Sequence, residues 1–158
     1  MFASFRLPLP IVENSTLWLS LGLVALTLLV GGGLKLASGR SKVVDSAEVI
    51  DLGRIGATKN GFPFTELGKK ATLLQFSTQY CGQCPGVARS LAQLEYRDGG
   101  LRHVEVDITD RLDLAAHFSI SQTPTIFILD KQGKIRSRIS GVPKPGAIQQ
   151  ELERLNNE

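Results

Sequence analysis

The sequence predicts an α/β domain with a central mixed sheet flanked by helices, preceded by one N-terminal transmembrane helix. From Thr72 onward the hydrophobic pattern reads strand, helix, strand, helix, strand, strand, helix. A β-α-β start followed by a hairpin and a covering helix gives a mixed sheet between helices. Before this region, no charged residue occurs between Glu13 and Lys35. We therefore expect four parts: a tail over 1–13, an anchor over 14–36, a linker over 37–46 and a globular domain over 47–158.

Composition supports a folded domain and excludes one class of partner. The chain has 158 residues, of which 42% are hydrophobic and 21% charged, as in ordinary globular proteins. The net charge of +3 is small, and the basic residues are scattered without interleaved aromatics. Nucleic-acid binding needs a concentrated basic surface, so we expect no nucleic-acid partner.

The apolar segment Asn14–Leu34 contains 21 residues without a charge. About 20 apolar residues span a bilayer, and Trp18 near one end suits a membrane interface. A cleaved signal peptide and a buried soluble helix are the alternatives. A signal peptide starts basic and has an apolar core of about 7–15 residues, whereas here Arg6 is offset by Glu13 and the run is longer. Residues 37–39 (Ala-Ser-Gly) keep cleavage open.

The basic residues around this segment predict its orientation. Only Arg6 precedes it, whereas Lys35, Arg40 and Lys42 follow it closely. Because Lys and Arg near a span favour the cytoplasmic side, we expect a single-pass protein of the cell membrane with its globular domain in the cytoplasm. An extracytoplasmic domain is the alternative.

The first half of the globular domain is defined by turns and one helix. Residues 47–52 suit either a short strand or a short helix. Asn60-Gly61 and Pro63 mark turns, and 72–76 form a mostly apolar strand. From Cys84 the spacing becomes helical, with Val87, Leu91 and Leu94 on one face, and 98–100 (Asp-Gly-Gly) ends the helix.

The second half supplies three strands and two helices. Residues 101–106 form a strand, and Asp110 is the candidate cap of a helix carrying Leu112, Leu114 and Phe118. An apolar strand over 125–129, a turn over 130–133 and a strand over 134–139 form a hairpin. A last amphipathic helix carries Ile148, Leu152 and Leu155.

The two cysteines of the chain, Cys81 and Cys84, have redox spacing. A bridge between them closes too small a loop to stabilise a fold much, so its value is chemical. The N-terminus of a helix favours a thiolate, which can attack a disulfide, after which the second thiol attacks the mixed disulfide. We expect Cys81 to be the exposed nucleophile and Cys84, one turn further, the shielded resolving thiol, without any cofactor.

Two other interpretations of the cysteine pair stay open. The same spacing occurs in zinc half-sites, but zinc needs four ligands, and the only histidines, His103 and His117, are isolated. We therefore expect no metal site within one chain. The pair could also belong to a redox-sensing or binding module without turnover.

A second motif, Thr123-Pro124-Thr125, precedes the apolar strand. Taken alone it is a common strand start, since a proline there removes no ladder hydrogen bond.

Together these motifs resemble the thioredoxin family. Leu73 to Cys84 (LLQFSTQYCGQC) looks like its strand and active-site turn, and Val106 to Phe118 looks like its next strand and helix, with a short insertion near Thr109. Ile120 to Thr125 (ISQTPT) looks like its cis-proline loop, and Ser140-Gly141 like the glycine that lets a substrate approach.

The resemblance implies a thioredoxin-like fold and a protein disulfide oxidoreductase. It implies that Pro124 is cis and lies against the Cys81 sulfur, and that the Thr123 backbone pairs with a substrate segment like an added strand. Further expected substrate contacts are Tyr80, Gly82, Gln83 and Gly141. Expected partners are protein disulfides, a reductase or membrane electron donor, and lipid around the N-terminal helix. Many anchored relatives of this type face outward, which conflicts with the charge-based orientation.

Three departures from the family pattern concern function. Tyr80 replaces the family's Trp, and Gln83 replaces the Pro inside the motif. Gln75 falls where the family has a buried Asp, and the Lys that pairs with this Asp falls near His103 or Glu105. Because Gln cannot accept a proton, the usual relay to the resolving thiol is in doubt. Glu105 is a candidate replacement; the alternative is a partly solvated strand carboxylate.

Overall fold

The computed structural model of the protein describes residues 12–37, 39–44 and 48–157. The chain divides into two compact units between Ala37 and Ser38. Helix α1 (Val12–Ala37) forms the first unit, and the sheet domain forms the second. The expected tail over 1–13 lies outside the described residues except for its last two, which begin α1.

Helix α1 contains a stretch, Ser15–Gly33, that is long and apolar enough to cross a membrane. The side chains of this stretch are exposed, as expected of a surface that meets lipid or a partner. Its polar side chains bond within the helix: Ser20 Oγ donates to Leu17 O at 2.9 Å and Thr27 Oγ1 to Val24 O at 2.8 Å. These properties fit an anchor and also fit a signal sequence.

The second unit is a seven-stranded mixed sheet in the order β1-β7-β6-β4-β5-β2-β3. The central strand β4 pairs in parallel with β5 and antiparallel with β6. This arrangement confirms the predicted mixed sheet and the order of its main elements. The strands are β1 (Ser41–Val43), β2 (Thr58–Lys59), β3 (Phe62–Pro63), β4 (Ala71–Ser77), β5 (Leu101–Asp107), β6 (Thr125–Asp130) and β7 (Ile135–Ser140).

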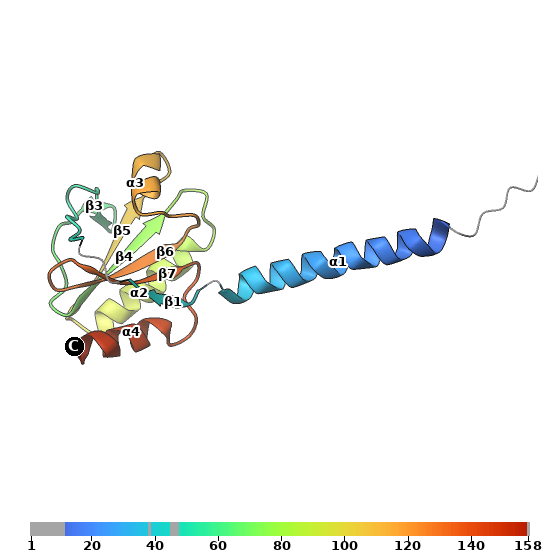
Figure 1. Cartoon of the computed structure of the whole chain (residues 1–158). Coiled ribbons are helices and arrows are strands. Elements are labelled where there is room, and N and C mark those ends of the chain that lie inside the picture. The colour runs from blue at the N-terminus through green and yellow to red at the C-terminus, as the bar shows by residue number, and fades with distance from the viewer. Residues whose placement is uncertain (1–11, 38, 45–47, 158) are drawn as a thin grey trace, which may run out of the picture. The chain divides into compact units, whose positions relative to one another are not determined.

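Helices cover both faces of this sheet, as the strand alternation requires (Figure 1). Helices α2 (Cys84–Arg97) and α4 (Ala147–Asn156) lie on one face, where Leu73, Leu91 and Ile148 belong to one core. Helix α3 (Leu112–His117) lies on the other face, where Phe76 and Phe118 belong to a second core. Strand β4 supplies buried side chains to both cores, which explains its nearly continuous apolar sequence.

Several boundary predictions were wrong. The linker over 37–46 contains β1, whose residues pair with β7 from Ser41 opposite Ile139. Asp110 does not cap α3: the N-cap residue is Arg111, which has no side-chain cap bond and instead pairs with Asp113. Residues 48–52 form neither a helix nor a strand beyond a single bridge at Val49; residue 47 lies outside the described residues.

The Asn60-Gly61 turn is confirmed. Asn60 and Gly61 have φ values of 53° and 80° and join β2 to β3. Two successive positive φ angles match the twist of a tight hairpin, which is why Asn-Gly is favoured there. Pro63 lies in the strand after this turn, not in the turn itself.

Candidate functional site

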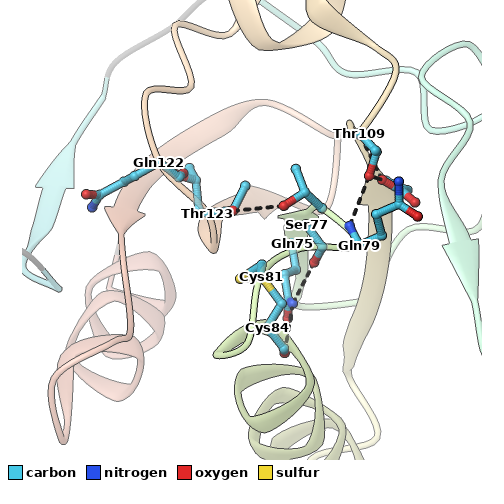
Figure 2. Close-up of a disulfide and its surroundings, with 11 residues drawn as sticks. Gln75, Ser77, Gln79, Cys81, Cys84, Thr109, Gln122 and Thr123 are labelled. Carbon is cyan, nitrogen blue, oxygen red and sulfur yellow. Dashed lines mark hydrogen bonds between the residues drawn. A yellow bond between two sulfur atoms is a disulfide. The ribbon is translucent and has the colours of Figure 1, made fainter.

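The two cysteines form a disulfide where β4 ends and α2 begins (Figure 2). Their Cα atoms are 5.4 Å apart. Cys81 lies in the turn before the helix and is half-buried, whereas Cys84 is only 4% exposed. Helix α2 begins at Cys84, as the helical spacing from this residue predicts, and Pro85 occupies its first turn, where its missing N–H is no loss.

The Thr123–Pro124 peptide bond is cis. Pro124 is buried, and its carbonyl oxygen accepts a hydrogen bond from the Gly141 N–H at 2.7 Å. Gly141 has a φ of 83°, the left-handed region that glycine adopts without strain. The fold therefore joins the proline loop to the end of β7, and two residues 17 positions apart in the chain become neighbours.

The cysteine turn contacts both neighbouring loops. Thr78 Oγ1 lies 3.4 Å from Thr123 Oγ1, which connects the turn to the proline loop. On the other side the Gln79 N–H donates to Thr109 Oγ1 at 2.9 Å (Figure 2). Thr109 is fixed by Asp107, whose carboxylate accepts from its backbone N–H at 2.8 Å. The loop near Thr109, where the sequence suggests an insertion, thus braces the cysteine turn.

The remaining expected substrate-contact residues surround the disulfide on the surface. Tyr80 is 83% exposed, so it projects into solvent rather than packing over the sulfurs. Gly82 and Gln83 are also exposed, and Thr123 is half-buried. Beside them, a groove of about 510 Å³ runs from Gln83 to Val142 along α2.

Gln75 lies directly beneath Cys84. It is fully buried, and its Nε2 donates to Ser77 Oγ at 2.8 Å and to the Cys84 carbonyl oxygen at 3.2 Å (Figure 2). Its Oε1 has no hydrogen-bond partner among the described residues. An amide here binds the backbone of Cys84 but offers no proton-accepting group. The hydrogen bonds from Gln75 to Ser77 and to the Cys84 carbonyl were not predicted, since no sequence pattern relates these groups.

Glu105 stands opposite Gln75 in the parallel register of β4 and β5. Residues opposite each other share a face of the sheet, here the face covered by α2. Glu105 is half-buried, and burial raises the pKa of its carboxyl group. It also lines a pocket of about 360 Å³ between α2 and β2. A half-buried carboxyl group is therefore carried by the residue that pairs with Gln75 on the neighbouring strand.

His103, the other candidate for the family's Lys position, lines the same pocket. It is only 6% exposed, and its Nε2 has no hydrogen-bond partner among the described residues. Desolvation lowers the pKa of His103 from 6.5 to about 4, while Glu95 raises it and Lys59 lowers it. The ring is therefore neutral at pH 7 and does not replace a lysine. His117 is exposed and contacts Glu48 at 2.7 Å.

The depressed pKa of His103 predicts an acid-dependent loss of stability. In the unfolded chain the ring gains a proton as pH falls through 6.5, whereas in the folded protein it does so only near pH 4. Between these values the unfolded state binds more protons, so the free energy of unfolding falls by about 1.4 kcal/mol per pH unit from this residue. Urea titrations at pH 7 and pH 5 should show this loss in wild type and a smaller one in His103→Phe. His117→Phe is the matched control, and an equal loss in His103→Phe and wild type would contradict the assignment.

The described residues contain no group of three or more His, Cys, Asp or Glu side chains that could hold a metal ion. The disulfide joins the half-buried Cys81 to the buried Cys84, and Thr78 of the cysteine turn contacts Thr123, which precedes the cis-proline. A sulfur pair in this setting can cycle between disulfide and dithiol by thiol exchange.

Comparison with known proteins also relates most of the sheet domain to disulfide-exchanging proteins. Residues 58–154 match the thioredoxin family. A thioredoxin H-type of Populus jackii is 27% identical over 112 residues, which cover 71% of this chain and 74% of the relative. Thioredoxin H9 of Arabidopsis thaliana is 32% identical over 76 residues, 48% of this chain and 54% of the relative.

The sheet domain also resembles solved structures. The crystal structure of a chloroplastic thioredoxin z superposes with a TM-score of 0.50 and 25% identity, covering 57% of this chain and 81% of that chain. The family match covers more than half of the chain and includes the Cys81–Cys84 disulfide. The chain belongs to the thioredoxin family and is a thioredoxin-type thiol–disulfide oxidoreductase.

Proposed function

We propose that Cys81 is the nucleophile and Cys84 the resolving thiol in the reduction of protein disulfides. The observation that carries this assignment is the difference in exposure: Cys81 is half-buried at the surface turn, whereas Cys84 is 4% exposed. The Cys81 thiolate attacks one sulfur of a substrate disulfide and releases the other as a thiolate. The Cys84 thiolate then attacks the Cys81 sulfur and releases the second substrate thiol. Two electrons pass to the substrate, and a reductase restores the dithiol.

We further propose that the substrate docks along the proline loop. Thr123 contacts Thr78 of the cysteine turn at 3.4 Å, and an extended substrate segment can pair with the Thr123 backbone as an added strand. Gly141 leaves room for that segment because it has no side chain. Tyr80, Gly82 and Gln83 are exposed around the cysteines and are the further substrate contacts in this proposal.

For the proton that Cys84 must lose, we propose Glu105 as the acceptor. Its raised pKa brings the carboxyl group closer to neutrality, where acid–base exchange is most efficient. Gln75 cannot take this role and instead orients Cys84 through its carbonyl oxygen. The pocket beside Glu105 gives solvent a route to the carboxyl group.

Turnover distinguishes this enzyme from a redox-sensing or binding module. Insulin reduction with dithiothreitol as electron donor should be accelerated by the wild-type protein and not by Cys81→Ser. Both cysteines, the cis-proline and Gly141 are present together, which a module without turnover would not need. Stoichiometric reduction of insulin without repeated cycles would contradict the enzymatic function.

We propose that α1 is an uncleaved membrane anchor and that the oxidoreductase domain faces the cytoplasm. Its apolar stretch, Ser15–Gly33, exceeds the core of a usual signal peptide, and basic residues follow it more closely than they precede it. In this orientation a cytoplasmic reductase supplies the electrons; the opposite orientation requires a membrane electron donor. Carbonate extraction should leave the full-length chain in the membrane, and release of a shortened chain would contradict the anchor. Protease should reach the sheet domain only after the cell membrane is opened.

A further inference from the structure

Residues Gly39–Val44, here called the strap, bind the loop beside the proposed substrate site. The Gly39 N–H donates to the Ser140 carbonyl oxygen at 2.7 Å, and the Gly39 carbonyl oxygen accepts from the Lys144 N–H at 3.1 Å. The strap then continues along the sheet edge as β1. Gly39 thus makes one backbone hydrogen bond to each end of the loop Ser140–Lys144.

Position 39 favours glycine for two separate reasons. Its φ of 74° lies in the left-handed region, where a side chain is strained. In addition, a Cβ atom there would lie 2.2 Å from the Val142 carbonyl oxygen, so the strap or the loop would have to move. Gly61 has a similar φ of 80°, but a Cβ atom there meets nothing within 4 Å. Close approach to the loop therefore distinguishes Gly39 from Gly61.

The loop that the strap binds carries Gly141, and Gly141 is bonded in turn to the proline loop through the Pro124 carbonyl oxygen at 2.7 Å. The loop is consequently held from both sides, by the strap at Ser140 and Lys144 and by the proline loop at Gly141. Its neighbour Val142 is exposed and borders the groove that leads to Gln83. A loop fixed in this way needs no further ordering when a protein substrate docks, which favours binding.

We propose that Gly39 is a positioning residue for substrate docking: the strap that follows α1 holds the Gly141 loop in the geometry that a protein disulfide requires. This role rests on the proposed function of the Cys81 site. It places a docking determinant outside the region of the family match, which begins at residue 58. It also makes the chain directly after α1 part of the substrate site.

Gly39→Ala in the full-length protein tests the proposal. We expect the KM for insulin to rise about tenfold, the change that follows from about 1.4 kcal/mol of lost preorganisation, while kcat changes less than twofold. The rate at which dithiothreitol reduces the Cys81–Cys84 disulfide should not change, because this small reagent does not use the loop. Hydrogen exchange at the Gly141 amide should be faster than in wild type.

Gly61→Ala is the matched control, since it adds the same backbone strain without the close contact. It should lower thermal stability and leave KM and the Gly141 exchange rate unchanged. A second pair of variants approaches the loop from its other end: Lys144→Pro removes the N–H that donates to Gly39, and Lys144→Ala keeps it. We expect only the proline variant to raise KM.

The outcomes separate this proposal from the proposed function. Unchanged KM and unchanged Gly141 exchange in Gly39→Ala would overturn the role of the strap while insulin turnover stands. An equal rise of KM in Gly61→Ala would also overturn it, because general destabilisation would then be the cause. Absence of insulin turnover in wild type would overturn the proposed function, and faster Gly141 exchange in Gly39→Ala would still support the hold on the loop.

Discussion

Replacing Cys84 by serine should lower insulin turnover by about a hundredfold or more and leave the protein covalently bound to its substrates. Without the second thiol, the mixed disulfide at Cys81 can be released only by an external thiol. Cys84 lies within disulfide distance of Cys81, with a Cα separation of 5.4 Å, and the chain has no third cysteine that could replace it. Non-reducing gels should show adducts that disappear with dithiothreitol.

Cys81→Ser is the control for this experiment. It leaves Cys84 as the single thiol of the chain, and Cys84, the first residue of α2, is buried. We therefore expect few or no adducts with this variant. Abundant adducts through Cys84 would show that the roles of the two cysteines are reversed.

Replacing Gln75 by aspartate should destabilise the fold by several kcal/mol and speed the resolving step near neutral pH. A carboxylate at this fully buried position is desolvated, which costs free energy or raises its pKa. The change also removes the donor that Gln75 Nε2 provides to Ser77 and to the Cys84 carbonyl. In return, a proton acceptor then lies beneath Cys84, as in the family pattern.

Gln75→Asn separates these effects, because it shortens the side chain without adding a charge. If Glu105 lies close enough to interact, its negative charge adds to the cost of Gln75→Asp. The double variant Gln75→Asp with Glu105→Lys should then recover part of the lost stability through an opposite-charge pair. Thermal unfolding of the two single variants, the double variant and wild type measures this coupling. Additive stabilities together with an unchanged resolving rate would show that neither position serves the relay.

The main elements of the fold were predictable because their patterns are local. β4 and β6 are apolar runs covered on both faces, and α2 has buried residues at helical spacing, Val87 and Leu91 among them. β1 was missed because its three residues pair with a strand more than ninety positions away. No local pattern distinguishes such an edge strand from a linker.

The chemistry of the candidate site was predictable from the sequence, whereas most of the hydrogen bonds that hold its residues in place were not. Cys-x-x-Cys spacing points to the sulfur chemistry, and the resemblance to the thioredoxin family implies the cis bond at Pro124, which is present. The predicted cap at Asp110 was wrong because Asp107, three residues earlier, organises this turn through Thr109. The contact between Gln75 and the Cys84 carbonyl depends on how α2 packs over β4, which spacing alone does not determine.

The contacts of Gly39 could not be predicted from the sequence either. In the sequence it belongs to an Ala-Ser-Gly segment that suits a signal-peptidase site. Its close contact with Val142 and its bonds to Ser140 and Lys144 arise only when the strap meets the far end of β7. A glycine required by close approach cannot be separated from a glycine in a flexible linker without the structure.

The most direct test of the central claim is brief iodoacetamide treatment of the reduced protein near neutral pH, followed by peptide mass mapping. We expect Cys81 to be alkylated and Cys84 to stay largely unmodified in the folded protein, because both lie near the positive end of α2 but only Cys84 is buried. Both cysteines should react after denaturation. Preferential alkylation of Cys84 in the folded protein would contradict the account.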